Sequence, residues 1–195
     1  MPYRTNVLVC AGTGCVSGNS FGVAQALENE VRKLGLDQEV KVIRTGCQGF
    51  CAEGPIVIVQ PDGIFYCGVQ QKDAVYIAQE HLLKGRVVKD LAWESRPEAM
   101  EALGLKEIPF FRKQVKIVLR NCGLIDPEDL HHYLARDGYR GFLHALELGP
   151  EAVVAEVKAA GIRGRGGAGF PTGQKWEFCR STGVLPRYLI CNADE

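Results

Sequence analysis

The stretch that decides the fold is a short apolar run that ends in glycines and cysteines, TNVLVCAGTGCVSG at residues 5–18. Its first six residues are mostly apolar and β-branched, which favours a buried strand, and the glycines that follow end the pattern. We therefore expect a strand over residues 5–10 and a loop over residues 11–18, with Cys10 at the end of the strand and Cys15 in the loop.

The same arrangement of a strand followed by cysteines recurs further along the chain. A second strand is expected around residues 40–43, and GCQGFCAEGP at residues 46–55 follows it, with Cys47 and Cys51 among glycines. Between the two strands, apolar residues recur at helical spacing over residues 20–34, which predicts an amphipathic helix. The pattern therefore predicts a βαβ unit in which both strands run into cysteine-bearing loops.

A hairpin and a second helix are predicted next. Residues 56–59 and 64–66 are apolar runs on either side of a Pro-Asp-Gly turn, and residues 73–83 follow a helical pattern. This order of elements is typical of a thioredoxin-like sandwich of a small mixed sheet and two helices. From residue 84 to 115 the pattern weakens, which predicts a connector with one short helix at residues 98–103.

The second half of the chain is predicted as helices around a glycine-rich loop. Asp-Pro and Gly-Pro pairs mark helix starts and predict helices over residues 126–136 and 150–160. The loop GIRGRGGAGFPTGQKW at residues 161–176 follows, then a short helix over residues 175–180 and a strand over residues 188–191 that ends in Asn-Ala-Asp-Glu.

Composition and charge exclude several classes of protein. The 195 residues include 23 Lys+Arg and 23 Asp+Glu, so the net charge is zero and gives no basic surface for nucleic acid. No stretch has the roughly 18 consecutive apolar residues of a transmembrane segment, and the N-terminus lacks the apolar core of a signal peptide. We therefore expect a cytoplasmic protein whose eight cysteines are reduced, which favours metal binding over disulfides.

Four of the cysteines form two close pairs, each at the end of a predicted strand. A 2Fe-2S cluster takes two thiolates on each iron, and glycine loops let backbone N–H groups approach the sulfurs. We predict that the pairs hold one such cluster; a zinc site or unligated thiols are the alternatives. The ligands would be Cys10, Cys15, Cys47 and Cys51. The remaining cysteines lie singly and are expected to be small core residues rather than ligands: Cys67, Cys122, Cys179 and Cys191.

These cysteines and this order of elements resemble the thioredoxin-like 2Fe-2S ferredoxin family, which also includes a small subunit of respiratory complex I. The resemblance implies an α/β fold for residues 1–86, with the cluster on the two cysteine loops. Cys-x-x-Cys, the spacing of thioredoxin redox sites, is absent, so disulfide reductase activity is not expected.

The glycine loop offers a second candidate site. It satisfies G-x-G-x-x-G as a string, but it follows a predicted helix rather than a strand, so a dinucleotide-binding interpretation is weak. Its unshielded backbone N–H groups, together with Arg163, Arg165 and Lys175, favour a phosphate or an electron-rich cofactor. Phe170 and Phe178 add flat apolar surface. A surface loop without a ligand is the alternative.

The acidic end of the chain favours a flavin at the same place. Asn192, Asp194 and Glu195 follow the carboxyl end of a predicted strand and can accept hydrogen bonds from sugar-alcohol hydroxyls. The adjacent histidines, His131 and His132, point in different directions on a helix, and we expect a solvated face there rather than a metal site.

Residues 161–195 resemble the FMN- and NADH-binding flavoprotein subunit of complex I and its relatives in NAD(P)-linked hydrogenases and formate dehydrogenases, and residues 117–160 resemble the preceding segment of that family. A fused N-terminal ferredoxin domain resembles the beta subunit of NAD(P)-reducing or electron-bifurcating hydrogenases. The resemblance implies that the nicotinamide pocket is bordered by Phe170, Phe178 and Glu195. It also implies contacts to FMN from Gly164, Arg165, Gly166, Gly167, Gly169, Lys175, Asn192 and Asp194.

The sequence therefore predicts an α/β protein with a 2Fe-2S ferredoxin domain at residues 1–86, a connector at residues 87–120 and an incomplete FMN/NADH-binding flavoprotein domain at residues 121–195. By resemblance its parent is an oxidoreductase of the NADH dehydrogenase or diaphorase type, which passes electrons between NAD(H) or NADP(H), FMN and iron-sulfur clusters.

The expected partners are a small 2Fe-2S subunit and a catalytic subunit of a hydrogenase, formate dehydrogenase or complex I-like assembly. Flavoproteins of this family continue beyond the acidic tetrapeptide and carry further iron-sulfur clusters, so we expect a C-terminally truncated fragment that assembles its cluster but binds FMN weakly and does not oxidise NADH. The alternative is a self-contained ferredoxin-like carrier or a zinc-stabilised interaction module.

Overall fold

The computed structural model describes residues 3–93, 108–188 and 190. The chain divides into two compact units, and the boundary between them in the sequence lies between residues 133 and 134. The predicted domain boundary at residue 121 comes earlier, and residues 121–133 lie with the first unit. The short helix expected at residues 98–103 lies outside the described residues.

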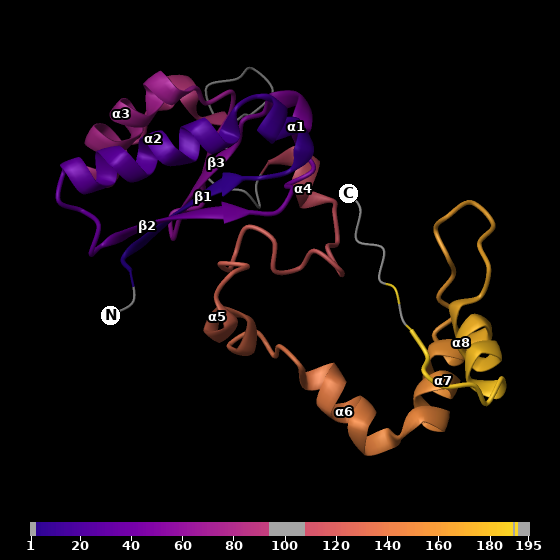
Figure 1. The fold of residues 1–195 in the computed structure, drawn as a ribbon. Coiled ribbons are helices and arrows are strands. Elements are labelled where there is room, and N and C mark those ends of the chain that lie inside the picture. Colours follow the sequence, from indigo (N-terminus) through magenta and orange to yellow (C-terminus); the bar gives the residue numbers. More distant parts are fainter. Residues whose placement is uncertain (1–2, 94–107, 189, 191–195) are drawn as a thin grey trace. The chain divides into compact units, whose positions relative to one another are not determined.

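The first unit is built on a four-stranded mixed sheet with the strand order β2-β1-β3-β4 (Figure 1). Strand β1 (Thr5–Cys10) pairs in parallel with β2 (Val40–Thr45) and antiparallel with β3 (Val57–Gln60). Strand β4 (Ile64–Tyr66) completes the predicted hairpin with β3. The βαβ and hairpin predictions are thus confirmed, and both cysteine segments follow strand ends on neighbouring parallel strands.

Both faces of the sheet are covered, because successive side chains of a strand point to opposite faces. On one face, Val7 and Val9 of β1 pack with Val57 and Val59 of β3 against the helices. On the other face, Leu8 and Cys10 belong to a second cluster; the remaining buried members are Cys15, Ile43, Ile56, Ile58, Phe65, Cys67, Trp93, Ile108 and Phe111. Cys10 and Cys15 therefore lie inside a core rather than at its edge.

Two helical segments lie side by side on the first face (Figure 1). Helix α2 (Ser20–Lys33) matches the predicted amphipathic helix and buries Val23, Ala24, Leu27 and Val31. The helix predicted over residues 73–83 is present but changes its winding along its length. It consists of η2 (Gln71–Asp73), α3 (Ala74–Tyr76) and the π-helical η3 (Ile77–Leu83).

The prediction of a loop over residues 11–18 is wrong in part, because these residues include a short helix, α1 (Thr13–Ser17), which carries Cys15. The extended backbone at Gly12 lets the helix start directly after the strand, because the Gly12 carbonyl accepts the Val16 N–H at 2.9 Å. Further short helices among the described residues of the first unit are η1 (Cys51–Glu53), η4 (Lys89–Leu91) and α4 (Pro109–Arg112).

The helix predicted over residues 126–136 is shorter in the structure, where α5 spans only Leu130–Leu134. The Asp126 carboxylate accepts the Glu128 N–H at 3.0 Å and forms a turn, and Asp129 accepts the His131 N–H at 2.9 Å, so Asp129 occupies the capping position. The left-handed backbone of Asp137 (φ 59°) lies beyond the helix end. The predicted Asp-Pro start is therefore wrong by one helical turn.

The described residues of the second unit include three helices beyond α5, with the glycine loop between the last two. Helix α6 (Arg140–Leu148) was not predicted, and α7 (Pro150–Ala159) confirms the helix predicted over residues 150–160. Helix α8 (Thr172–Ser181) contains the short helix predicted over residues 175–180 but begins three residues earlier, within the predicted loop. Gly173 of α8 lies so close to α7 that a Cβ atom there would be 2.6 Å from the Lys158 backbone nitrogen. The predicted strand over residues 188–191 falls partly outside the described residues, and Tyr188 and Ile190 are not in a strand.

No helix among the described residues combines the length and the apolar character that crossing a membrane requires.

Candidate functional site

The four paired cysteines converge at the ends of β1 and β2. Cys10 ends β1 and Cys15 lies on α1, and both thiols are buried. Cys47 and Cys51 follow β2, with their Sγ atoms 3.8 Å apart. Two sulfurs bound to one tetrahedral metal at about 2.3 Å must lie about 3.8 Å apart. The outer pair therefore already has the separation of two ligands on a single metal ion.

Glycines keep the space between the two pairs narrow. A Cβ atom on Gly54 would lie 2.8 Å from Cys15 Sγ, which is closer than real Cβ atoms come to a neighbour. A Cβ atom on Gly14 would lie 3.2 Å from Cys51 Cβ and 3.5 Å from Cys51 Sγ. Gly14 thus brings the α1 segment against the outer pair, and Gly54 brings the outer segment against the inner pair. One thiol of each pair, Cys15 and Cys51, therefore lies against a glycine cradle that a larger residue would fill.

The two pairs differ in their environment. Cys10 and Cys15 are 2% and 1% exposed, whereas Cys51 is exposed and Cys47 is half-buried. Burial raises the pKa of the Cys15 thiol to about 11, and neighbouring Cys10 and Cys51 add to the shift. Such a thiol keeps its proton at neutral pH unless a positive metal centre displaces it.

Among residues 3–93, 108–188 and 190, no group of three or more His, Cys, Asp or Glu side chains is arranged to hold a single metal ion. A binuclear cluster does not need such a group, because each iron takes two thiolates. The donor set of two cysteine pairs and the glycine cradle therefore fit a 2Fe-2S cluster better than a mononuclear site.

Of the cysteines expected to be isolated, Cys67 is buried as predicted and Cys191 lies outside the described residues. Cys122 and Cys179 are not small core residues, so the expectation is wrong for these two cysteines. Cys179 is exposed on α8. Cys122 is half-buried beside the outer cysteine loop, where its thiol donates to the Cys47 carbonyl at 3.2 Å. No pattern within the sequence signals that contact, since the two residues are 75 positions apart.

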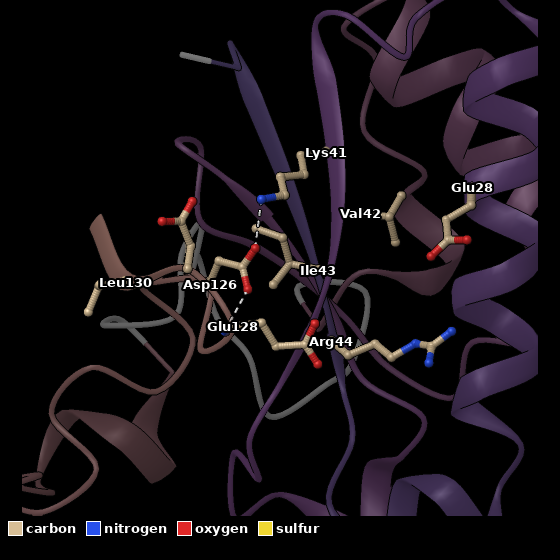
Figure 2. A pocket seen from close by; sticks show the side chains of 9 residues that line it. Glu28, Lys41, Val42, Ile43, Arg44, Asp126, Glu128 and Leu130 are labelled. Carbon is tan, nitrogen blue, oxygen red and sulfur yellow. Dashed lines mark hydrogen bonds and ion pairs between the residues drawn. The ribbon is translucent and has the colours of Figure 1, made fainter. Parts of the chain in front are cut away.

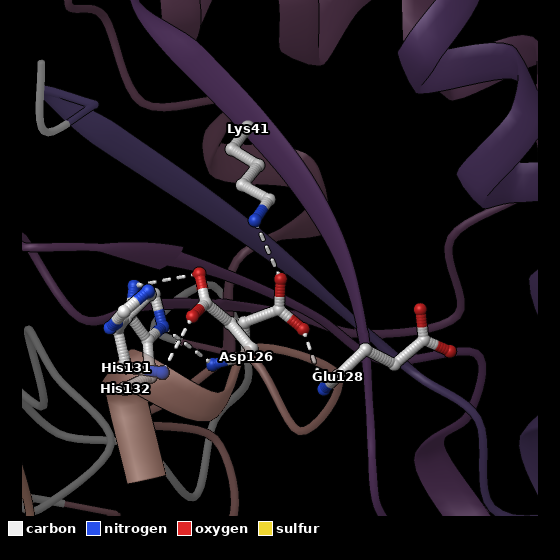
Figure 3. Close-up of polar contacts among 6 residues, drawn as sticks. Lys41, Asp126, Glu128, His131 and His132 are labelled. Atoms are coloured by element: carbon white, nitrogen blue, oxygen red, sulfur yellow. Dashed lines mark hydrogen bonds and ion pairs between the residues drawn. The ribbon is translucent and has the colours of Figure 1, made fainter. Parts of the chain in front are cut away.

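A polar pocket of about 470 Å³ lies beside β2 in the same unit (Figure 2). Lys41 Nζ approaches Asp126 Oδ2 to 2.7 Å across it, and hydrogen bonding to Asp126 raises the pKa of Lys41 (Figure 3). His132 Nδ1 accepts the Asp126 N–H at 3.1 Å, so this histidine fixes the turn before α5. The pocket is lined by Glu28, Lys41, Val42, Ile43, Arg44, Asp126, Glu128, Asp129 and Leu130.

The glycine loop of the second unit closes as a hairpin-like turn. The Gly164 N–H donates to the Phe170 carbonyl at 2.9 Å, and the Thr172 N–H donates to the Ile162 carbonyl at 2.9 Å. Gly167 and Gly169 have left-handed backbones with φ of 102° and 60°, which a residue with a side chain adopts with strain. No heavy atom would contact a Cβ on Gly166, so its backbone is open to a ligand.

The structure brings some of the predicted flavin and nicotinamide residues together but not all. The rings of Phe170 and Phe178 lie 6.4 Å apart, and Lys175 lines an apolar groove of about 860 Å³ with Trp176. The loop glycines Gly164, Gly166, Gly167 and Gly169 do not line this groove, and Arg165 is exposed to solvent. Asn192, Asp194 and Glu195 lie outside the described residues.

Comparison with known proteins finds similarity for both halves. Residues 157–195 match a family described as the Nuo51 FMN-binding domain. The chain is 50% identical over 84 residues to "NADP-reducing hydrogenase subunit HndC" of Solidesulfovibrio fructosivorans, an alignment covering 43% of this chain and 17% of that subunit. It is 40% identical over 77 residues to "Ferredoxin, 2Fe-2S" of Clostridium pasteurianum, covering 40% of this chain and 76% of the ferredoxin.

Among solved structures, a thioredoxin-like [2Fe-2S] ferredoxin from Aquifex aeolicus aligns with a TM-score of 0.44 and 29% identity, over 47% of this chain and 91% of that chain. The chain thus matches only 17% of the length of the hydrogenase subunit but about three quarters of the Clostridium ferredoxin. Both resemblances inferred from the sequence are confirmed as similarities.

Proposed function

We propose a function for this chain from the premise that it belongs to the 2Fe-2S ferredoxin family. Its first unit holds one 2Fe-2S cluster, and its second unit contributes part of a site for FMN and a nicotinamide nucleotide. The observation that carries the proposal is the meeting of two cysteine pairs, one with Sγ atoms 3.8 Å apart, in a cradle formed by Gly14 and Gly54. When bound, the cluster supplies a carrier for single electrons.

The two cysteine pairs hold the cluster from different environments. Cys10 and Cys15 form the inner ligand pair, which the core around Ile58 and Phe65 keeps away from water. Cys47 and Cys51 form the outer pair, where the Gly49 N–H donates to Cys47 Sγ at 3.3 Å. A hydrogen bond to a ligand sulfur favours the more negative, reduced state of a cluster. Electrons would enter and leave on the exposed side of Cys51.

The proposed flavin site uses the glycine loop. Open backbone at Gly166, with the cations Arg165 and Lys175 nearby in sequence, suits the phosphate of FMN. Phe170 and Phe178 provide an aromatic wall for a nicotinamide ring. Support comes from the similarity of residues 157–195 to an FMN-binding domain. The proposed FMN contacts are Gly164, Arg165, Gly166, Gly167, Gly169, Lys175, Asn192 and Asp194, with Glu195 at the nicotinamide pocket.

For the whole protein we propose an NAD(P)H-linked oxidoreductase that passes electrons from a nicotinamide nucleotide through FMN to iron-sulfur clusters. Relatives named as hydrogenase and NADH-quinone oxidoreductase subunits support such a parent. Its partners would be a small 2Fe-2S subunit and a catalytic subunit of a hydrogenase, formate dehydrogenase or complex I-like assembly, in the cytoplasm.

Metal and sulfide analysis of the anaerobically purified chain tests the cluster proposal. We expect two irons and two sulfides per chain and a visible charge-transfer spectrum, as a 2Fe-2S composition demands. Cys47→Ser should remove the spectrum, whereas the control Cys179→Ser, on the exposed side of α8, should keep it. A colourless chain with one zinc would support the zinc-stabilised module instead, because the 3.8 Å separation of Cys47 and Cys51 also suits zinc.

Flavin titration tests the second unit. Gly166 is the informative position, because its φ is not left-handed and a side chain there meets no protein atom. In a protein that binds FMN, Gly166→Val should weaken binding by occupying the space of the ligand without straining the loop. Gly141→Ala on α6, also in open space, is the matched control. Unchanged FMN affinity in Gly166→Val would mean that the loop has another role.

A further inference from the structure

The thiol of Cys122 connects a distant segment of the chain to the outer cysteine loop. Its Sγ donates to the Cys47 carbonyl at 3.2 Å and accepts the Gln48 Nε2–H at 3.1 Å. The Gln48 side chain is buried, with 3% exposure, and also donates to the Gly46 carbonyl at 3.3 Å. Cys122 and Gln48 therefore hold three consecutive residues of this loop by hydrogen bonds.

The residue after Cys122 fixes the same segment to the end of β2. The Gly123 N–H donates to the buried Thr45 Oγ1 at 3.2 Å. Gly123 has a left-handed backbone (φ 77°), and a Cβ atom there would lie 3.0 Å from the Gln48 amide. The close fit leaves Cys122 little room to move away from Cys47.

The backbone geometry of this loop determines whether the Gly49 N–H can donate to the sulfur of Cys47, a proposed cluster ligand. The Gly49 N–H points at Cys47 Sγ, 3.3 Å away, from a backbone with φ of 76°. The donor and the acceptor are two residues apart, so their alignment depends on the peptide groups of Cys47 and Gln48. Cys122 holds the Cys47–Gln48 peptide group at the Cys47 carbonyl and also accepts a hydrogen bond from the Gln48 side chain.

We infer that Cys122 is a positioning residue for the 2Fe-2S cluster: without being a ligand, it holds the Cys47 carbonyl so that the Gly49 N–H stays directed at Cys47 Sγ. The inference rests on the proposed function, because it requires the cluster. It also assigns a role to the part of the first unit around Cys122, which then affects the reduction potential of the cluster.

A redox titration of the cluster-loaded chain tests the inference. A hydrogen bond to an anionic group changes an equilibrium by about tenfold. Cys122→Ala, which removes both hydrogen bonds, should therefore lower the midpoint potential by about 59 mV for this one-electron couple. Cys122→Ser should stay close to wild type, because its hydroxyl can still donate to the Cys47 carbonyl. Cys179→Ala is the control on the second unit.

A second variant approaches the same contact from the other partner. Gln48→Met keeps the side-chain volume but removes the donor to Cys122 Sγ and to the Gly46 carbonyl, so its potential should shift in the same direction. If Cys122→Ala does not fold, the potentials of Gln48→Met and Cys122→Ser together test the positioning role of Cys122. Amide exchange of Gly49 should also accelerate in Cys122→Ala and in Gln48→Met.

The outcomes separate this inference from the proposed function. A wild-type chain that binds no iron and sulfide overturns both. A wild-type chain with a cluster, together with a Cys122→Ala variant at the wild-type potential, overturns the positioning role alone. An equal shift in Cys122→Ser and Cys122→Ala would also overturn it, because loss of packing rather than of the hydrogen bond would then be responsible.

Discussion

Replacing Gly54 with alanine should prevent the cluster from binding while leaving the fold intact. The added Cβ would lie 2.8 Å from Cys15 Sγ, whereas ordinary contact starts at 3.4 Å, so one of the two atoms must move by about 0.6 Å. Metal–ligand distances tolerate only about 0.2 Å. Cys15 is 1% exposed and packed in the core, so its sulfur cannot turn away without displacing its neighbours.

The cost to the apo fold should be moderate. Overpacking of a well-packed core costs about 1–3 kcal/mol. The backbone of Gly54 (φ −69°, ψ 163°) suits alanine, and the lost flexibility of the unfolded chain returns about 0.4–1 kcal/mol. We therefore expect Gly54→Ala to lower the free energy of unfolding of the apo chain by about 1–2 kcal/mol, measured by urea denaturation followed by circular dichroism.

Iron and sulfide content after anaerobic reconstitution is the decisive assay. We expect less than a tenth of the wild-type content in Gly54→Ala. Gly14→Ala is the matched control, because its Cβ would lie 3.2 Å from Cys51 Cβ, a smaller shortfall that the exposed side chain of Cys51 can absorb. Wild-type iron content in Gly54→Ala, or equal losses in both variants, would refute the idea that Gly54 sets the width of the site.

Three further predictions concern stability. His81 is buried, with its Nδ1 2.8 Å from the Tyr66 hydroxyl, and burial lowers the pKa of His81 below 6.5. The unfolded chain therefore takes up the proton at a higher pH than the folded chain, so the free energy of unfolding falls as the pH drops below 6.5. His81→Gln should flatten this part of a plot of urea midpoint against pH. Asp126→Asn weakens the contact to Lys41 and should cost about 1–3 kcal/mol in the same assay. Gly173→Ala places a Cβ 2.6 Å from the Lys158 backbone, which cannot yield, and should accelerate amide exchange in α8 by separating it from α7.

Exposed counterparts control these tests. Asp137→Asn removes a charge from an exposed carboxylate 4.0 Å from Arg140 and should change stability by less than about 0.5 kcal/mol. Gly141→Ala lies in α6 with open space around it and should leave the exchange of α8 unchanged. A pH profile of His81→Gln that matches wild type, or equal costs in Asp126→Asn and Asp137→Asn, would contradict the corresponding prediction.

Local patterns of sequence were enough to predict the sheet of the first unit. The alternation of Val7, Leu8 and Val9 supplies both faces of β1, and the Pro-Asp-Gly turn supplies the hairpin, so strands β1 to β4 are where the sequence indicates them. The two cysteine pairs could be recognised for the same reason, since each directly follows its strand. Such features depend on neighbours within a few residues.

Features that depend on distant contacts could not be predicted. Asp126 was expected to cap a helix, but its carboxylate is used by Lys41 and by the Glu128 N–H, so α5 begins later. Cys122 was expected among apolar residues, but it contacts a loop 75 positions earlier. Helix α6 was missed because no side-chain cap marks its start: the residue before it, Tyr139, has a left-handed backbone with φ of 62° and makes no side-chain capping hydrogen bond.

Because the two cysteine pairs are unequally buried, reagents from solution should reach the outer pair before the inner pair. A chelator, an alkylating agent or an oxidant meets Cys51 at the surface, whereas Cys10 and Cys15 lie behind the sheet residues of the core. Damage to a bound cluster would therefore start at the iron of the outer pair and reach the inner pair last. Assembly would follow the reverse order, because the inner thiols are closed off once the core has formed and the outer loop remains the last opening.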